Sequence, residues 1–85
     1  GIIFGGSGQG EAMAANRYKG VRAAVFYDGP DEIISLSRQH NNANILSFGS
    51  RFIEPSRAIE LIKMWLDTNF EGGRHQQRIQ KLESY

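Results

Sequence analysis

A glycine-rich loop that ends in a carboxylate is the part of the sequence best suited to chemistry. Residues 5–11 read Gly-Gly-Ser-Gly-Gln-Gly-Glu and lie between an apolar run and a segment rich in helix-forming residues. Where such a loop enters a helix, free backbone N–H groups and the helix dipole create a site for an anion. The N–H groups and the Ser7 hydroxyl could stabilise an oxyanion while the carboxylate of Glu11 moves a proton. These are the groups needed to form an enediolate from a sugar or hydroxycarbonyl.

The same loop fits neither of the common nucleotide-binding patterns. The pattern G-x-G-x-x-G would require glycine at position 11 or 13, which hold Glu11 and Met13, and a P-loop would require a lysine that is missing. The sequence therefore disfavours a dinucleotide or P-loop site. Taken alone, Glu11 is explained more simply as a first-turn carboxylate that complements the helix dipole.

Other polar residues could bind an anion further along the chain. Arg74 and Arg78 are four residues apart in a polar helical segment, so they share a face on which two guanidinium groups could hold one phosphate. An isolated pair with this spacing is more often a solvated basic face. His40 lies near the end of an expected helix, where histidine commonly caps or packs. His75 has no ligand partner at metal-binding spacing, so we expect no metal.

The composition predicts one small folded domain. The chain has 85 residues, of which 40% are hydrophobic, so a core is expected rather than disorder. Ten Lys and Arg against nine Asp and Glu leave a net charge of +1, too little for a general attraction to nucleic acid or anionic membrane. There is no apolar run long enough for a membrane span and no cysteine for disulfides or thiolate metal sites. We expect a soluble, cytoplasmic protein without nucleic-acid or membrane partners.

Three apolar runs, each followed by a turn and a helical pattern, predict an α/β fold with the order β-α-β-α-β-α-α. That order implies right-handed crossovers and a parallel sheet with helices on both faces. The expected strands are residues 2–4, 22–26 and 44–48, and the expected helices are residues 11–17, 30–41, 55 onward and 74–83. The sides expected to face the sheet hold Ile33, Leu36 and Ser37 in the second helix and Ala58, Ile59, Ile62, Trp65 and Leu66 in the third. Because three strands would leave the apolar first strand with an open edge, we expect further strands from the same chain or a partner.

Several segments together resemble one family, the type B ribose-5-phosphate isomerases grouped with the galactose-6-phosphate isomerase subunits. The segments are GSGQGE at 6–11, AANR at 14–17, GVRAA at 20–24, RQHNNAN at 38–44, FGSR at 48–51 and FEGGRHQQR at 70–78. The likeness spans essentially the whole chain. It implies a Rossmann-like α/β/α sandwich, cofactor-free aldose–ketose isomerisation in the pentose phosphate pathway, and a homodimer or tetramer with active sites at the subunit interface.

The resemblance also implies roles for individual residues. Most members have a cysteine base where this chain has Gly5, but a subgroup instead has a glutamate directly after the loop, at the position of Glu11. His40 matches a histidine that assists opening of the furanose ring, and Asn41 matches a neighbour that contacts substrate hydroxyls. Ser7 with the loop glycines matches the group that stabilises the enediolate, and three arginines match those around the substrate phosphate. The binding residues implied in this way are Gly6, Gly8, Gly10, Asn41, Arg51, Arg74 and Arg78, and residues 73–84 form a phosphate-gripping helix.

Two departures from the family pattern leave an alternative open. Members also have an N-terminal half with further βαβ units and a sugar-binding loop, which these residues do not match, so the chain is interpreted as a C-terminal part. The stretch Tyr27–Ile34 is slightly longer than in typical members. The alternative is a non-catalytic phosphosugar-binding or assembly subunit. Nucleic-acid binding through Arg74, Arg78 and Lys81 is disfavoured by the low net charge and by the lack of interleaved aromatic residues.

Overall fold

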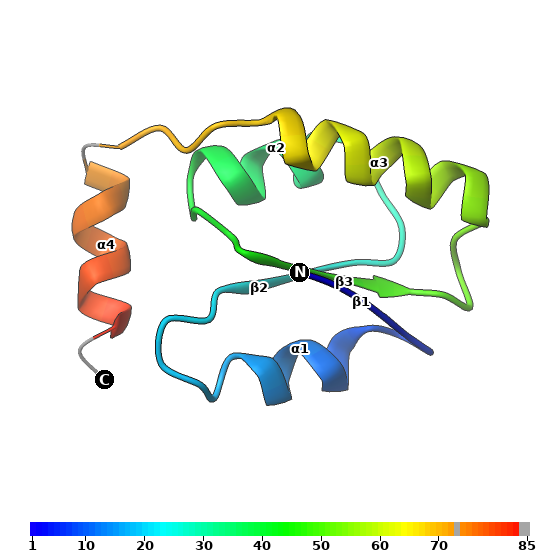
Figure 1. The fold of residues 1–85 in the computed structure, drawn as a ribbon, viewed down its shortest axis with the longest axis horizontal. Coiled ribbons are helices and arrows are strands. Elements are labelled where there is room, and N and C mark those ends of the chain that lie inside the picture. Colours follow the sequence, from blue (N-terminus) through cyan, green and yellow to red (C-terminus); the bar gives the residue numbers. More distant parts are fainter. Residues whose placement is uncertain (73, 84–85) are drawn as a thin grey trace.

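Three parallel strands form a sheet with helices on both faces (Figure 1), as the sequence predicts. The structure is a computed structural model that describes residues 1–72 and 74–83, with only the backbone described for Arg74, His75 and Glu83. The strands are β1 (Ile2–Gly5), β2 (Ala23–Phe26) and β3 (Ile45–Gly49). The helices are α1 (Gln9–Ala15), α2 (Glu32–Gln39), α3 (Pro55–Asp67) and α4 (Arg74–Glu83). None of the helices in the described part of the chain is long and apolar enough to cross a membrane.

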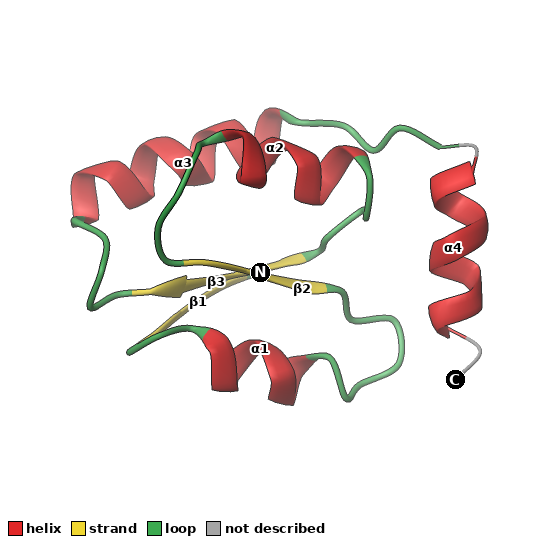
Figure 2. Cartoon of the chain, turned by 180° about the vertical axis from the view of Figure 1, so that it is seen from behind, coloured by secondary structure: helices red, strands yellow, loops and turns green. Residues whose placement is uncertain are grey.

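The third strand in sequence is the central strand of the sheet. The strand order is β1-β3-β2, with Phe4 of β1 and Phe26 of β2 both paired to Phe48 of β3. Helix α1 covers one face, and α2 and α3 cover the other (Figure 2). Residues 46–49 of β3 are all buried, as expected for the central strand of a parallel sheet that helices cover on both faces.

The parallel arrangement defines two edges of the sheet. The carboxyl ends of the strands lead into the glycine loop after β1, Tyr27 after β2, and residues 50–54 after β3. The amino ends are preceded by residues 20–22 before β2 and 40–44 before β3. Helix α4 stands apart from the two helical layers, beyond the amino ends of β2 and β3 (Figure 1).

The buried side chains of α3 differ in part from the predicted stripe. Ala58 and Trp65 are buried as expected, but Leu61 is buried as well, whereas Ile59 and Leu66 are 54% and 61% exposed. The predicted stripe is therefore rotated about the helix axis from the side that is buried. Each residue turns the direction of the side chain by about 100°, because the helix has 3.6 residues per turn. Positions 58, 61 and 65 lie close together on that wheel and face the sheet.

Helix α2 shows the same error of phase. Ile34 and Ser37 are buried, whereas Ile33 and Leu36 are 41% and 40% exposed. The hydrophobic core that results contains Phe26, Ile34, Ala43, Leu46, Phe48, Ala58, Leu61 and Trp65.

Two helices also begin at other residues than predicted. Helix α1 begins at Gln9, two residues before Glu11, because Gly8 takes a left-handed conformation with φ 77° and ends the loop there. Helix α2 begins at Glu32 instead of Pro30. The residues before it form a tight turn in which the Ile33 amide donates to the Pro30 carbonyl at 3.1 Å, three residues back.

Two paired glycines end β1 and β3 and determine how closely the following loops pack. Gly5 lies beside Gly49 in the parallel register. A Cβ atom on Gly49 would lie 2.6 Å from the backbone oxygen of Ser7 and 2.6 Å from Cβ of Tyr27. The nearest atoms to a Cβ on Gly5 instead all belong to the carboxylate end of Glu11, which is flexible. The two glycines are therefore required for different reasons.

We expect Gly49→Ala to lower the free energy of unfolding by about 1–3 kcal/mol, because backbone must move to admit the methyl group. Gly5→Ala should cost less than about 1 kcal/mol, since the Glu11 side chain can rotate away. Denaturant unfolding of the two variants and the parent in the complete protein measures both values. Equal losses at the two positions would contradict this account of the loop packing.

Candidate active site

The glycine loop is fixed on the central strand by a buried hydrogen bond. The hydroxyl of Ser47, which is 0% exposed, donates to the Gly8 carbonyl at 2.7 Å. A Cβ atom on Gly8 would lie 2.9 Å from the carbonyl carbon of Phe48, so only glycine can pack there, and its φ of 77° also favours glycine. The loop therefore lies directly on the backbone of β3.

The segment after β3 holds the other side of the loop. The Ser50 amide and hydroxyl both donate to the Gly5 carbonyl, at 2.7 and 3.0 Å, and the Arg51 amide donates to the Gly6 carbonyl at 3.2 Å. In a trans peptide the N–H of the next residue points opposite to the carbonyl. The amides of Gly6 and Ser7 consequently point away from β3 and the segment after it, as an oxyanion site requires.

The carboxylate of Glu11 lies over Gly5 at the end of β1. Its Oε2 atom would be 2.7 Å from a Cβ on Gly5, so the carboxylate occupies the space that any larger residue at position 5 would fill. Glu11 lies in the first turn of α1 and is half-buried. The guanidinium of Arg51 lies over the next residue, with Nε 3.1 Å from a Cβ built on Gly6. A carboxylate and a guanidinium thus lie over successive residues of one loop.

The remaining loop positions have distinct environments. The Ser7 hydroxyl accepts a hydrogen bond from the Gln9 amide at 3.3 Å, which orients it within the loop. Gly10 is the second residue of α1, and a Cβ there would meet nothing within 4 Å. The packing therefore gives no reason for glycine at position 10, although its amide is one of the first N–H groups of the helix, which lack intrahelical acceptors.

His40 and Asn41 lie at the opposite edge of the sheet, in the turn between α2 and β3. Asn42 adopts a left-handed conformation with φ 47°, and its amide donates to the Arg38 carbonyl at 3.1 Å. This ends α2 and carries the chain into β3. Five residues of strand separate this turn from the loop after β3, a distance of about 15 Å.

Hydrogen bonds to the segment before β2 hold this turn. Arg22 donates through Nε to the Asn42 carbonyl at 2.9 Å, and its amide donates to Oδ1 of Asn44 at 2.8 Å. Asn44 in turn donates through Nδ2 to the Gly20 carbonyl at 2.8 Å. The sequence did not single out Arg22 or Asn44, although both lie within the motifs that carry the family resemblance.

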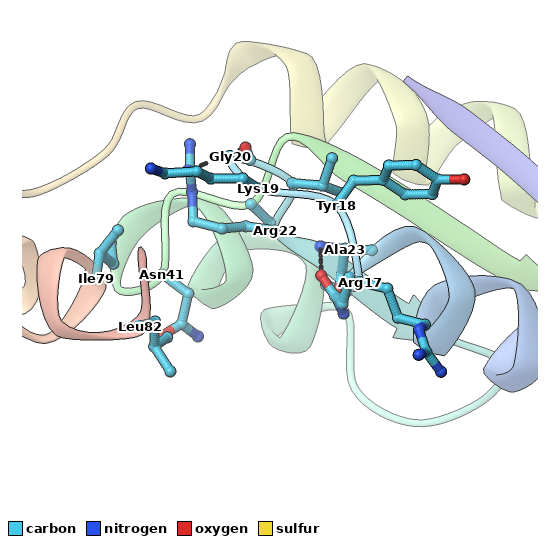
Figure 3. Close-up of a pocket in the computed structure, with 13 residues that line it drawn as sticks. Arg17, Tyr18, Lys19, Gly20, Arg22, Ala23, Asn41, Ile79 and Leu82 are labelled. Atoms are coloured by element: carbon cyan, nitrogen blue, oxygen red, sulfur yellow. Dashed lines mark hydrogen bonds between the residues drawn. The ribbon is translucent and has the colours of Figure 1, made fainter. Parts of the chain in front are cut away.

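An open pocket of about 760 Å³ lies beside the turn (Figure 3). Asn41 lines it together with Ile79 and Leu82 of α4 and with the segment from Asn16 to Ala24. Among the described residues that line the pocket, Arg17, Lys19 and Arg22 are cationic and none is acidic. An anion is therefore the ligand that its charge favours.

The predicted site residues thus fall into two groups within one chain. Glu11, Ser7, the loop glycines and Arg51 lie together at the carboxyl edge of the sheet. His40 and Asn41 lie at the amino edge, where α4 carries the exposed Arg78. The side chain of Arg74 and residues 73 and 84 of the predicted phosphate-gripping helix lie outside the described residues. One chain does not bring the two groups together.

Sequence reasoning missed the serines that hold the loop. Ser47 is a polar residue in the middle of an apolar strand, and Ser50 follows the last strand residue directly. A buried hydroxyl requires a hydrogen-bond partner, so the isolated polar position in the run at 44–48 was the available signal for Ser47.

Comparison with known proteins gives consistent matches over the whole chain. Residues 1–82 match the Ribose/Galactose Isomerase family. A probable ribose-5-phosphate isomerase B of Mycoplasma genitalium is 47% identical over 85 residues, which cover 100% of this chain and 55% of the relative. The ribose-5-phosphate isomerase B of Escherichia coli K12 is 43% identical over 82 residues, covering 96% of this chain and 54% of the relative.

Solved structures of ribose-5-phosphate isomerases B have the same fold over this chain. The crystal structure of the Mycoplasma genitalium ribose-5-phosphate isomerase B with bound ribulose-5-phosphate has a TM-score of 0.93 at 47% identity, covering 100% of this chain and 55% of that one. The chain thus spans about half the length of the relatives it matches. The match over residues 1–82 and the shared fold show that this chain belongs to the ribose/galactose isomerase family.

Proposed function

We propose that this chain forms the catalytic half of a phosphosugar isomerase that interconverts ribose 5-phosphate and ribulose 5-phosphate, with Glu11 as the base. The observation that carries the proposal is the position of the Glu11 carboxylate over Gly5. Most family members have a cysteine base at that position, so the glutamate places a proton acceptor where the missing side chain would be. The relatives' names and the ribulose-5-phosphate bound to one of them support this substrate class.

The proposed reaction needs a base and a site for negative charge. Glu11 removes the proton from C2 of the opened aldose, and the electrons of that C–H bond form the C1–C2 double bond while the charge moves to O1. The amides of Gly6 and Ser7 and the Ser7 hydroxyl stabilise this enediolate. Glu11 returns the proton to C1, O1 takes up the proton released by O2, and O2 becomes the ketone oxygen. No cofactor is needed for this transfer.

A complete active site requires two copies of the chain in this proposal. His40 and Asn41 lie about 15 Å of strand away from the glycine loop, too far to act on the same carbon chain as Glu11 within one copy. In a homodimer, a twofold axis can place the amino edge of one copy against the carboxyl edge of the other, which forms two equivalent sites. The cationic pocket and α4, with Arg74 and Arg78, would then receive the phosphate, while His40 assists ring opening.

We expect Glu11→Gln in the complete protein to lower kcat by at least about 1,000-fold, because the amide cannot accept the C2 proton. Binding should persist, because the loop and the phosphate site are unchanged. Proton NMR in D2O with ribose 5-phosphate follows exchange at C2 and formation of ribulose 5-phosphate. Undiminished exchange in the variant would exclude Glu11 as the base. An inactive parent that ribose 5-phosphate still stabilises against heat would instead favour the non-catalytic alternative.

A cysteine at position 5 should replace the function of Glu11. In the background of Glu11→Ala, the space over Gly5 is empty, and Gly5→Cys puts a thiol into it. We expect the double variant to be at least about tenfold more active than Glu11→Ala alone, since a thiolate is an effective base near its pKa. The gain should rise with pH as the thiol ionises. Gly5→Ser with Glu11→Ala is the matched control, and equal activity of the two double variants would contradict the proposal.

Mixing two inactive variants tests whether the site is shared between copies. In a heterodimer of Glu11→Gln and His40→Ala subunits, one of the two sites combines an intact Glu11 with an intact His40. Random reassociation of equal amounts makes half of the dimers mixed, so activity should return to about a quarter of the parent value. Unfolding and refolding the variants together, with each refolded alone as control, measures this. No recovery from the mixture would place both residues of a site in one chain.

A further inference from the structure

The guanidinium of Arg38, in the last turn of α2, joins three parts of the structure. Its Nη1 donates to the Ala43 carbonyl at 2.8 Å, and its Nε donates to the Thr68 carbonyl at 3.2 Å. Its Cζ atom lies 4.6 Å from the centroid of the Trp65 ring. The planar group thus connects the end of α2 with the residue before Asn44 and with the end of α3.

The Trp65 ring beneath Arg38 is itself held in the core. Trp65 is 2% exposed, and its indole N–H donates to the Ser37 hydroxyl at 3.2 Å. That hydroxyl donates to the Ile34 carbonyl at 2.7 Å, so both groups are satisfied within the core. A guanidinium that lies over such a ring and donates two hydrogen bonds has little freedom of orientation.

The same contacts determine where the turn with His40 and Asn41 lies. Two hydrogen bonds connect the turn to α2, from the Asn42 amide to the Arg38 carbonyl at 3.1 Å and from the Ala43 amide to the Ser37 carbonyl at 2.9 Å. Arg38 adds the link to Thr68, which connects the turn to α3. Arg22 connects the turn to the segment before β2, and Arg38 is the side chain that connects it to the end of α3.

The segment between α3 and α4 also contacts the end of α2. The Glu71 amide donates to the Gln39 carbonyl at 2.9 Å, so the segment between α3 and α4 runs beside the end of α2. The segment that leads to the helix expected to bind the phosphate is therefore fixed next to Arg38, at the same end of α2 as His40.

We infer that Arg38 is a positioning residue that acts through His40, a role that rests on the proposed function. It touches no substrate in this scheme. Its stacked and doubly hydrogen-bonded guanidinium fixes the direction from which the imidazole reaches the ring oxygen. Lysine cannot reproduce this, because an ammonium group has no planar face and no fork of donors.

The test compares two arginine-to-lysine variants in the complete protein. Arg57 is the matched control, because its guanidinium donates to the Gly29 carbonyl at 3.2 Å and to Asp31 at 2.9 Å and lies 5.8 Å from the Phe26 ring centroid. These contacts are of the same kinds, but they lie on the loop before α2, away from the turn with His40. Arg38→Lys should lower kcat/KM for ribose 5-phosphate by roughly 10- to 100-fold and Arg57→Lys by less than about threefold.

A double-mutant cycle separates positioning from a general loss of stability. In the background of His40→Ala, the imidazole is already absent, so Arg38→Lys should cost less than about threefold more. An undiminished further loss in that background would overturn the inference, as would equal activities of Arg38→Lys and Arg57→Lys. Arg38→Gln, which keeps a planar amide donor, takes the place of Arg38→Lys where the lysine variant does not fold.

The NMR spectrum of His40 tests the inference independently of activity. The imidazole C–H resonance of His40, assigned by its loss in His40→Ala, should shift or broaden in Arg38→Lys and stay unchanged in Arg57→Lys. An unchanged resonance in Arg38→Lys would overturn the positioning role even in an active enzyme. Absence of isomerisation in the parent, with the resonance shifted as expected, would instead contradict the proposed function and leave the structural role of Arg38 supported.

Discussion

Close packing between the glycine loop and the end of the central strand is the constraint on which the carboxyl edge of this fold depends. The contact excludes a Cβ atom at Gly8 and at Gly49, and it buries the hydrogen bond from Ser47 to the Gly8 carbonyl. Removing the donor would leave the Gly8 carbonyl with the Ala12 amide as its partner, a loss of about 0.5–1.5 kcal/mol. The same contact makes the loop rigid and turns its amides outward. Stability and the geometry of the proposed oxyanion site therefore depend on the same atoms.

In the proposed reaction, the base reaches the end of β1 from position 11 and not from position 5. Gly5 ends β1, and a side chain there would project where the Glu11 carboxylate lies. A base can reach this space from the strand, through one short side chain, or from the first turn of the helix, through a longer one. The second route requires glycine at position 5. In this interpretation Gly5 and Glu11 act together, because the missing side chain of Gly5 leaves the space that the Glu11 carboxylate occupies.

The order of elements could be predicted from the sequence because each strand is a continuous apolar run punctuated by glycine, proline or asparagine. Helix phase could not, because Ile59 and Leu66 are as hydrophobic as Leu61, and only the packing of α3 on the sheet decides which of them is buried. The start of α1 depended on a left-handed Gly8 among several glycines that looked equivalent. The family resemblance named the site residues as a set of motifs, but no local pattern indicated that His40 and Glu11 would lie at opposite edges. Their roles remain predictions.

The division of the site between two edges has a physical origin in the parallel sheet. Loops at the carboxyl ends lead into helix N-termini, whose amides attract negative charge, so an enediolate is best stabilised there. The turns at the amino ends follow helix C-termini and have no such amides to offer, but they can carry a histidine and basic side chains. A substrate with an anionic phosphate at one end and a reacting carbon at the other needs both kinds of environment. A single small sheet keeps them a strand length apart, whereas two copies related by a twofold axis can bring them into contact twice. The proposed activity would then depend on association, because an isolated copy has the proposed base and oxyanion site at one edge and the proposed ring-opening histidine at the other.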